Sequence, residues 1–130
     1  MYALDTNTLI SFFKGEGRVA DRLLDTTPTE IAVPTVVIYE LHVGIAKSTS
    51  PHRRRRQLDA MMEYVTLLSF DEKAAREAAE IRATLEARGN PVGPIDNLIA
   101  GTTRASGAIL VTRNTDGFSR VDGLRLDDWY

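Results

Sequence analysis

The chain has 130 residues, of which 43% are hydrophobic and 26% charged, with a formal net charge of −2 and no cysteine. This composition suits one globular domain over residues 1–130 and excludes disulfides, zinc–thiolate sites and thiol nucleophiles. No basic leader precedes Asp5 and no apolar run approaches the ~20 residues of a membrane span, so we expect a cytoplasmic protein.

The first half of the chain predicts short strands that alternate with helices. The opening apolar run ends at Asp5, and Thr6 or Asn7 can cap the helix that follows it. Pro34 and Pro51 precede or begin further helices. The expected elements are a strand over 2–4, helices over 6–14 and 18–25, a strand over 30–33, helices over 35–47 and 51–64, and a strand over 65–69.

The second half contains the clearest helix of the sequence. After a capping Asp71, the apolar residues Ala74, Ala78, Ile81 and Leu85 recur at spacings of four, three and four, which marks one buried face. The remaining expected elements are a helix over 94–106, a strand over 108–111 and a last short strand over 124–126.

The alternation of strands and helices predicts an α/β fold. The runs 30–33 and 108–111 are apolar throughout, as strands are when helices cover both faces of a parallel sheet. We therefore expect a three-layer α/β/α sandwich with a central parallel sheet of about five strands. In such sheets the functional crevice lies beyond the carboxyl ends of the strands, so acids at these ends are candidate site residues.

Three aspartates are predicted at this edge, each with a structural alternative. Asp5 directly follows the first strand and could instead be a helix cap. Asp96 stands in a first helical turn, where the helix dipole alone favours a negative charge. Asp116 follows the strand that ends at Val111, and could be only a turn residue beside Gly117.

Glu40 lies in a strongly apolar helix, next to Leu41. Gly44, four residues further on, shares its helix face and leaves open space beside it. This pattern is not typical of a solvated face, and the alternative is a salt bridge to one of the arginines.

If these acids converge, they require a cation, because carboxylates at close range repel one another and raise each other's pKa. Oxygen ligands without cysteine, and with only two histidines, favour Mg²⁺ or Mn²⁺ over Zn²⁺. Such a site suits phosphodiester hydrolysis, since metal ions ionise a water and stabilise the leaving oxygen.

A compact cationic run, Arg53, Arg54, Arg55 and Arg56, follows His52. The negative net charge counts against a nucleic-acid substrate, but a local patch can still attract a phosphate backbone. The run could equally bind an acidic partner segment, or be a solvated helix face.

Four segments together resemble a known family. They are YALDTNTLI at 2–10, VPTVVIYELHVGIAKS at 33–48, PVGPIDNLIAG at 91–101 and ILVTRNTDGFSRVDGLRLDDW at 109–129. In this order and spacing they resemble the PIN-domain ribonucleases, and within them the VapC toxins of bacterial VapBC toxin–antitoxin pairs.

The resemblance implies a PIN-like sandwich and Mg²⁺-dependent endoribonuclease activity that a VapB-like antitoxin inhibits. The family's acids fall on Asp5, Glu40 and Asp96, of which Asp5 and Asp96 commonly hold the metal. The substrate implied is tRNA, the initiator tRNA in particular. Such toxins dimerise and bury an antitoxin helix, and the apolar first helix, with Phe12 and Phe13, is a candidate partner surface.

The closing motif departs from the family pattern, in which an acid stands directly before the phenylalanine. Here Gly117 stands before Phe118, and Asp116 lies one place earlier. Either Asp116 or Asn114 could complete the site. Further polar neighbours that could hold a carboxylate or a metal-bound water are Thr6, Asn7 and Thr112.

Two other functions remain open at this point. One is a PIN-like protein that binds RNA or a partner without catalysis, which the displaced Asp116 would allow. The other is an aspartyl-phosphate phosphohydrolase using Asp5. That chemistry needs a second acid two residues on, where this chain has Asn7, and a lysine after strand 108–111, which is missing.

Overall fold

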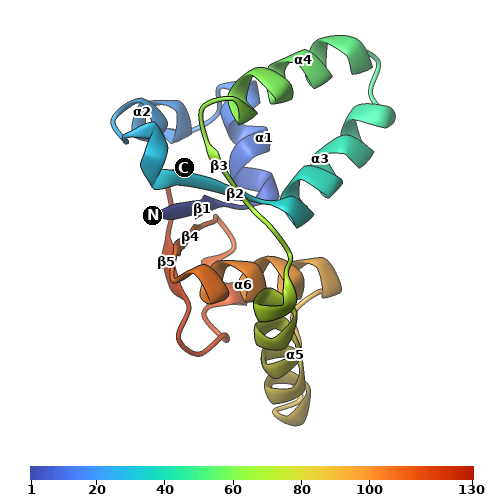
Figure 1. Ribbon diagram of the computed structural model, residues 1–130, viewed down its shortest axis with the longest axis vertical. Helices are drawn as coiled ribbons and strands as arrows, with labels where there is room; N and C mark the ends of the chain where they lie inside the picture. The colour runs from blue at the N-terminus through green and yellow to red at the C-terminus, as the bar shows by residue number, and fades with distance from the viewer.

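A computed structural model describes residues 1–130 and contains one five-stranded sheet in the order β3-β2-β1-β4-β5 (Figure 1). All four neighbouring pairs are parallel, which confirms the predicted α/β sheet of five strands. The strands are β1 (Tyr2–Leu4), β2 (Ile31–Pro34), β3 (Thr66–Leu68), β4 (Ile109–Val111) and β5 (Arg125–Asp127).

Helices cover both faces of the sheet. The first four lie on one side, and α5 and α6 lie on the other, so the three-layer sandwich is also confirmed (Figure 1). None of them combines the length and the hydropathy that crossing a bilayer requires. The helices are α1 (Thr6–Lys14), α2 (Val19–Leu24), α3 (Thr35–Ala46), α4 (Pro51–Met62), α5 (Glu72–Ala87), α6 (Pro94–Ser106) and the short α7 (Thr115–Phe118), with a 3₁₀ turn over Pro28–Glu30.

Two details of the helix starts differ from the prediction. The cap of α1 is Asp5, whose Oδ1 accepts a hydrogen bond of 2.9 Å from the backbone N–H of Thr8, rather than Thr6 or Asn7. Asp116, for which a turn was the structural alternative, lies in the short helix α7, whose first turn is capped by the side chain of Asn114.

The core forms where β1 and β4 lie between the helix layers. Leu4, Leu9, Leu110 and Val111 are completely buried. On α5 the buried residues are Ala74, Ala78, Ile81 and Leu85, as the helical spacing predicts.

Close packing of α5 on α6 fixes the start of α6. A Cβ atom on Gly101 would lie 2.5 Å from the Cβ of Ala78, so the two helix backbones approach as closely as a glycine allows. Nearby, the buried Asn97 donates a hydrogen bond of 2.9 Å from its Nδ2 to the carbonyl of Ala78. These two contacts fix the position of α6 relative to α5, and with it the first turn of α6, which carries Asp96.

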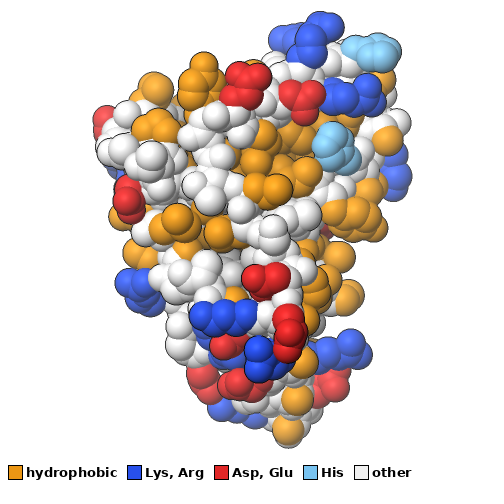
Figure 2. All heavy atoms as spheres, in the orientation of Figure 1, with side chains coloured by type: hydrophobic (Ala, Val, Ile, Leu, Met, Phe, Trp, Pro, Cys, Tyr) orange, Lys and Arg blue, Asp and Glu red, His pale blue; other side chains and the backbone are white.

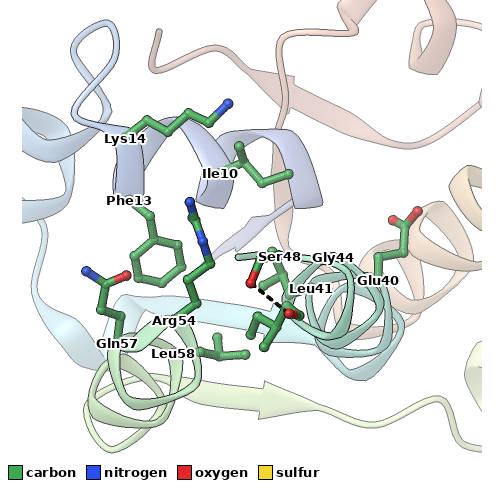
Figure 3. A pocket seen from close by; sticks show the side chains of 11 residues that line it. Ile10, Phe13, Lys14, Glu40, Leu41, Gly44, Ser48, Arg54, Gln57 and Leu58 are labelled. Carbon is green, nitrogen blue, oxygen red and sulfur yellow. Dashed lines mark hydrogen bonds between the residues drawn. The ribbon is translucent and has the colours of Figure 1, made fainter. Parts of the chain in front are cut away.

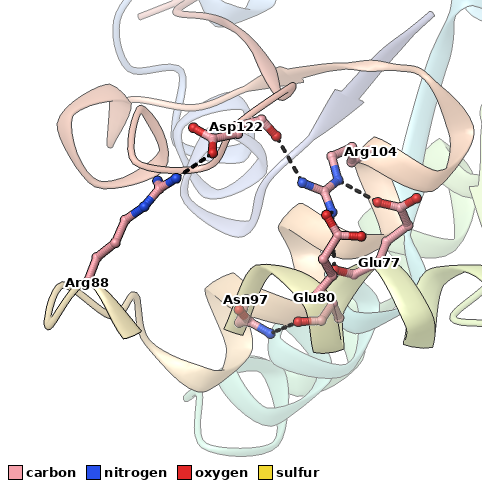
Figure 4. A network of polar contacts seen from close by, with 7 residues as sticks. Glu77, Glu80, Arg88, Asn97, Arg104 and Asp122 are labelled. Atoms are coloured by element: carbon pink, nitrogen blue, oxygen red, sulfur yellow. Dashed lines mark hydrogen bonds and ion pairs between the residues drawn. The ribbon is translucent and has the colours of Figure 1, made fainter. Parts of the chain in front are cut away.

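A polar network fastens the C-terminal segment to the same pair of helices (Figure 4). Arg104 of α6 is paired with Glu77 and Glu80 of α5, and its Nη1 donates to the backbone carbonyl of Asp122 at 2.9 Å. Arg88 binds the carboxylate of Asp122 at 2.8 Å. The side chain of Arg104 is only 16% exposed, so its charge is neutralised in a partly dry setting, where pairing matters more than on an open surface.

Substitution of Gly101 tests the close approach of α5 and α6. We expect Gly101→Ala to lower the free energy of unfolding by about 1–3 kcal/mol, because the added methyl group overpacks the contact with Ala78. Gly44 is the matched control, since it is also a helix-interior glycine but has open space at its Cβ position. Gly44→Ala should leave stability unchanged or raise it by up to ~1 kcal/mol. Urea unfolding measures both, and equal effects would contradict the packing argument.

Candidate active site

Asp5 lies at the junction of β1 and α1, and only 5% of the residue is exposed. Its backbone N–H donates to the carbonyl of Val111 at 3.1 Å, which ties it to the end of β4. Its side chain caps α1 through Thr8. The predicted position at the carboxyl edge of the sheet and the alternative role as a helix cap are therefore both correct for the same residue.

Burial is the main reason why the pKa of Asp5 is raised, and the negative charge of Glu40 adds to it. The hydroxyl of Thr112 opposes this shift most strongly, followed by the backbone N–H and the hydroxyl of Thr8. The Thr8 hydroxyl already donates to the carbonyl of Val111 at 3.0 Å. Thr112 accepts from the backbone of Asn114, so its own hydrogen is free for Asp5. We therefore regard Thr112 as the side chain that keeps Asp5 ionisable.

Asp96 stands in the first turn of α6, which begins at Pro94, and is partly buried. Burial raises its pKa, and the negative charges of Asp5 and then of Glu40 raise it further. Carboxylates influence one another in this way only when they are near neighbours. Three acids, one at the junction of β1 and α1 and the others on α3 and α6, thus gather at one place, although they are far apart in the sequence.

Glu40 faces this place from the middle of α3. Its Oε1 accepts a short hydrogen bond from the hydroxyl of Thr6, the first residue of α1. None of the salt bridges of the chain includes Glu40, so the alternative of an arginine partner is wrong. Thr6 therefore sets the position of this carboxylate, and it leaves Oε2 without a protein donor.

The three acids do not form a preformed metal site. No group of three or more carboxylate and imidazole side chains is arranged as a preformed ligand set for an ion. The donor chemistry nonetheless fits a hard cation such as Mg²⁺ or Mn²⁺, because every nearby ligand atom is an oxygen. A bound cation would also relieve the repulsion that raises the pKa of Asp96.

The two candidates for a fourth ligand belong to α7 and its cap. Asp116 is exposed on α7, and its charge is not among those that raise the pKa of Asp5 or Asp96. Asn114 uses its Oδ1 to accept from the N–H of Gly117 at 3.2 Å. A Cβ atom on Gly117 would lie 2.5 Å from Asn114 Nδ2, so an acid at position 117 would displace the cap. The glycine at position 117 therefore leaves the space that the side chain of Asn114 needs to cap α7.

Sequence reasoning missed two residues of this region, and a third, Asn7, makes no side-chain hydrogen bond in it. Thr8 was not singled out, although its place three residues after Asp5 is the capping distance. Lys14 was missed because only the packing of α1 against α3 and α4 brings it to the groove that Glu40 also lines. Asn7 is exposed and its side chain makes no hydrogen bond, so it holds neither a carboxylate nor the backbone in this structure.

A groove between α1, α3 and α4 leads to Glu40 (Figure 3). Its volume is about 250 Å³. Apolar side chains form much of its wall, and Glu40 lies at the end opposite to Gln57 (Figure 3). The residues that line this α1/α3/α4 groove are Ile10, Phe13, Lys14, Glu40, Leu41, Gly44, Ile45, Ser48, Arg54, Gln57 and Leu58.

Positive side chains gather beside this groove, at the end where α3 meets α4 (Figure 2). The four arginines Arg53, Arg54, Arg55 and Arg56 are all exposed on α4, and none of them forms a salt bridge. The cationic run of the sequence is therefore a free positive surface and not part of a network of ion pairs.

Known proteins share this architecture and sequence. The family model of the PIN domain matches residues 2–124. A curated relative named tRNA(fMet)-specific endonuclease VapC, from Shigella flexneri, is 36% identical and covers 98% of this chain and 97% of its own length. Ribonuclease VapC2 of Haemophilus influenzae is 30% identical, again over 98% of this chain and 97% of its own.

Solved structures agree with these relatives. VapBC2 from Rickettsia felis, bound to a DNA fragment from its promoter, has a chain that superposes with a TM-score of 0.92 at 30% identity, covering 99% of this chain and 98% of that one. DNA-bound VapBC from Salmonella typhimurium gives a TM-score of 0.92 at 33% identity, with the same coverage. The chain belongs to the PIN domain family and, within it, to the VapC ribonucleases.

Proposed function

We propose that this protein is the toxin of a type II toxin–antitoxin pair, an endoribonuclease that hydrolyses RNA phosphodiester bonds, with residues 1–130 acting as one PIN domain. The carrying observation is that three acids from separate elements gather at the carboxyl edge of the sheet: burial and the charge of Glu40 raise the pKa of Asp5, and burial and the charges of Asp5 and Glu40 raise the pKa of Asp96. Acids that repel one another at close range lower the stability of a fold, and a cation bound between them would offset this cost. Clusters of perturbed acids are therefore typical of functional sites.

In this proposal Asp5 and Asp96 hold Mg²⁺, for which Mn²⁺ can substitute. When bound, the ion supplies an attacking water of lowered pKa and neutralises charge on the phosphate. Thr112 keeps Asp5 available as an anion. Glu40, oriented by Thr6, has its other carboxylate oxygen free to accept a hydrogen bond from the attacking water and so to aim it at phosphorus. Asp116 and Asn114 remain the two candidates for the residue that completes the site.

The proposed substrate is tRNA, the initiator tRNA in particular, and the proposed partner is a VapB-like antitoxin. The names of the relatives in Shigella flexneri and Salmonella typhimurium support the substrate. The partner is supported by the titles of the similar structures, which are VapBC complexes. We propose a cytoplasmic location, where tRNA is found, and a homodimer that joins the antitoxin in a larger assembly.

A PIN-like protein that binds RNA without cutting it is the second candidate. It is favoured by one observation, that the three acids do not form a preformed ligand set. Binding of RNA in the presence of Mg²⁺ without any cleavage would decide for it. The aspartyl-phosphate mechanism has no comparable support, because Asn7 offers no acid for the leaving group.

Loss of single carboxylates tests the catalytic assignment. We expect Asp5→Asn, Glu40→Gln and Asp96→Asn each to lower Mg²⁺-dependent cleavage of tRNA by at least about 100-fold, since each removes a ligand or positioning oxygen. Asp116→Asn is the matched control, with the same change of charge on an exposed side chain, and should cost less than about tenfold.

Single-turnover cleavage of purified initiator tRNA measures these losses, with EDTA as the metal-free blank. Equal cutting by the wild type and all variants would reveal a contaminating nuclease and remove the assignment. A loss for Asp116→Asn as large as that for Asp96→Asn would instead make Asp116 the fourth member of the site.

Thermal stability without metal tests the repulsion at Asp96. The folded-state pKa of Asp96 is raised, so its ionisation costs stability at neutral pH, and this cost disappears as pH falls below the usual aspartate value of 3.8. We therefore expect Asp96→Asn to melt about 2–5 °C higher than the wild type in EDTA at pH 7, with no difference near pH 3.

Circular dichroism melting curves in EDTA and in Mg²⁺ give the comparison. Mg²⁺ should raise the melting temperature of the wild type more than that of Asp96→Asn, because the ion binds the folded site. A clear fall in the melting temperature of metal-free Asp96→Asn would mean that Asp96 serves α6 as a structural residue.

A further inference from the structure

One arginine next to the acids has no partner for its N–H groups. Arg113 directly follows Thr112, whose hydroxyl opposes the rise in the pKa of Asp5, and it is exposed. It forms no salt bridge and no side-chain hydrogen bond. The other arginines after α5 all donate to protein oxygens, and they are Arg88, Arg104, Arg120 and Arg125. The N–H groups of Arg113 are therefore available to a ligand.

The aromatic ring of Tyr130 holds this guanidinium in place. The central carbon of the Arg113 guanidinium lies 3.4 Å from the centroid of the ring. A cation over the face of an aromatic ring is attracted by the negative charge of that face. A guanidinium that contacts a ring in this way can still use the N–H groups at its edge to bind a carboxylate or a phosphate. The contact with Tyr130 therefore orients Arg113 without neutralising it.

Tyr130 is itself fixed against the connection between α1 and α2. Its backbone oxygen accepts from the N–H of Arg18 at 2.7 Å, and its own N–H donates to Oδ1 of Asp128 at 2.9 Å. A Cβ atom on Gly17, which has a φ of +62°, would lie 2.7 Å from the Tyr130 ring, so the ring packs directly on the glycine backbone. Arg113 thus has a rigid support before any ligand binds, which lowers the entropy cost of binding.

The strand order places Arg113 and Glu40 on opposite sides of Asp5. Strand β1, which ends just before Asp5, lies between β2 and β4. Helix α3 with Glu40 follows β2, whereas Arg113 follows β4. The charge of Arg113 is not among those that set the pKa of Asp5 or of Asp96. Arg113 therefore stands beside the acid cluster and not within it, at a place that suits a phosphate next to the one that is cut.

An RNA strand that crosses this cluster needs a cation from the protein. The three carboxylates repel its phosphates, and a metal ion held by Asp5 and Asp96 would neutralise only the centre of the site. A guanidinium at the flank attracts the neighbouring phosphate, because its planar fork of N–H groups matches two phosphate oxygens. An exposed and orientated arginine without an acidic partner is suited to this contact.

We infer that Arg113 binds the backbone phosphate beside the cleaved bond of the RNA substrate, and that Tyr130 is the positioning residue for this contact. The inference rests on the proposed function, because it assigns a contact to the RNA of that reaction. The alternative is a purely structural role, in which Arg113 only fastens Tyr130 to the end of β4. A structural role affects the melting temperature, whereas a phosphate contact affects RNA binding and its dependence on salt.

The test compares arginines at the two edges of the sheet. Arg113→Gln removes the proposed contact. Arg125→Gln is the matched control, since Arg125 is also exposed but stands at the start of β5, opposite Ile109, at the amino edge. Single-turnover cleavage of purified initiator tRNA in Mg²⁺ separates the half-saturating protein concentration from the maximal rate. Fluorescence anisotropy of fluorescein-labelled initiator tRNA in EDTA measures binding without metal-dependent cleavage.

We expect Arg113→Gln to raise the half-saturating concentration about tenfold and to change the maximal rate less than about threefold. The slope of log affinity against log salt should fall by about 0.7, as for the loss of one phosphate contact to a single strand. Arg113→Lys keeps the charge but not the planar fork, and should weaken binding about threefold. Arg125→Gln should weaken it less than about twofold.

Variants of Tyr130 test the positioning role. Tyr130→Phe keeps the ring and should bind tRNA like the wild type, whereas Tyr130→Leu should bind about threefold more weakly. If Tyr130 acts through Arg113, the double variant Arg113→Gln/Tyr130→Leu binds no more weakly than Arg113→Gln alone. Melting curves establish that each variant is folded at the temperature of the assay.

Equal losses for Arg113→Gln and Arg125→Gln would overturn the inference, because they would show general attraction of RNA by positive charge. Unchanged tRNA binding in Arg113→Gln with a lower melting temperature would assign the arginine to the structural role, and with weaker binding of a VapB-like antitoxin it would assign it to the protein partner. Absence of cleavage by the wild type in Mg²⁺ is a separate result, which defeats the proposed function while the binding comparison in EDTA still decides whether Arg113 contacts RNA.

Discussion

The carboxylate of Asp5 is withdrawn from water at the point where β1 ends and α1 begins, and it still accepts a backbone hydrogen bond from Thr8. Burial of an acid without compensation is costly, so its surroundings must supply donors. Thr8 and Thr112 supply them from α1 and from the end of β4. Because parallel pairing brings β1 beside β4, the same contact that builds the sheet also brings the residue after Val111 to this acid. The site is thus a consequence of the strand order, with Asp5 at its centre.

The other two acids reach Asp5 through helix packing. Asp96 depends on the close approach of α6 to α5, which Gly101 permits and the Asn97 hydrogen bond to the α5 backbone aligns. Glu40 depends on the packing of α3 beside α1, where the Thr6 hydroxyl receives it. Each helix therefore contributes one carboxylate and has its own contact to hold it. The charges repel, so the packing of both helices has to offset the cost of bringing them together.

Much of this could be predicted from the sequence, because local patterns carry it. Apolar runs defined the strands, the spacing of Ala74 to Leu85 defined the buried face of α5, and strand ends singled out Asp5. Long-range packing could not be read in the same way. The sequence does not show that the Asn114 side chain fills the space beside Gly117, nor that α1 and α4 bring Lys14 and Arg54 to one groove. Such contacts arise from how the helices approach one another, which no spacing along the chain encodes.

The arginines of α4 and those on and next to α5 differ in whether they form ion pairs, which the sequence alone does not show. On and after α5, arginines stand near acids in the sequence or in space, and Arg76 and Arg82 pair with glutamates one turn away. The arginines of α4 form no salt bridge, although Asp59 stands one turn after Arg55, so their charge remains available. A chain with an excess of acid can therefore still present a positive surface, provided that its ion pairs are concentrated elsewhere. Position on the fold, rather than net charge, decides where such a surface lies: Lys14 and Arg54 line the groove, and Glu40 lies at its end opposite to Gln57.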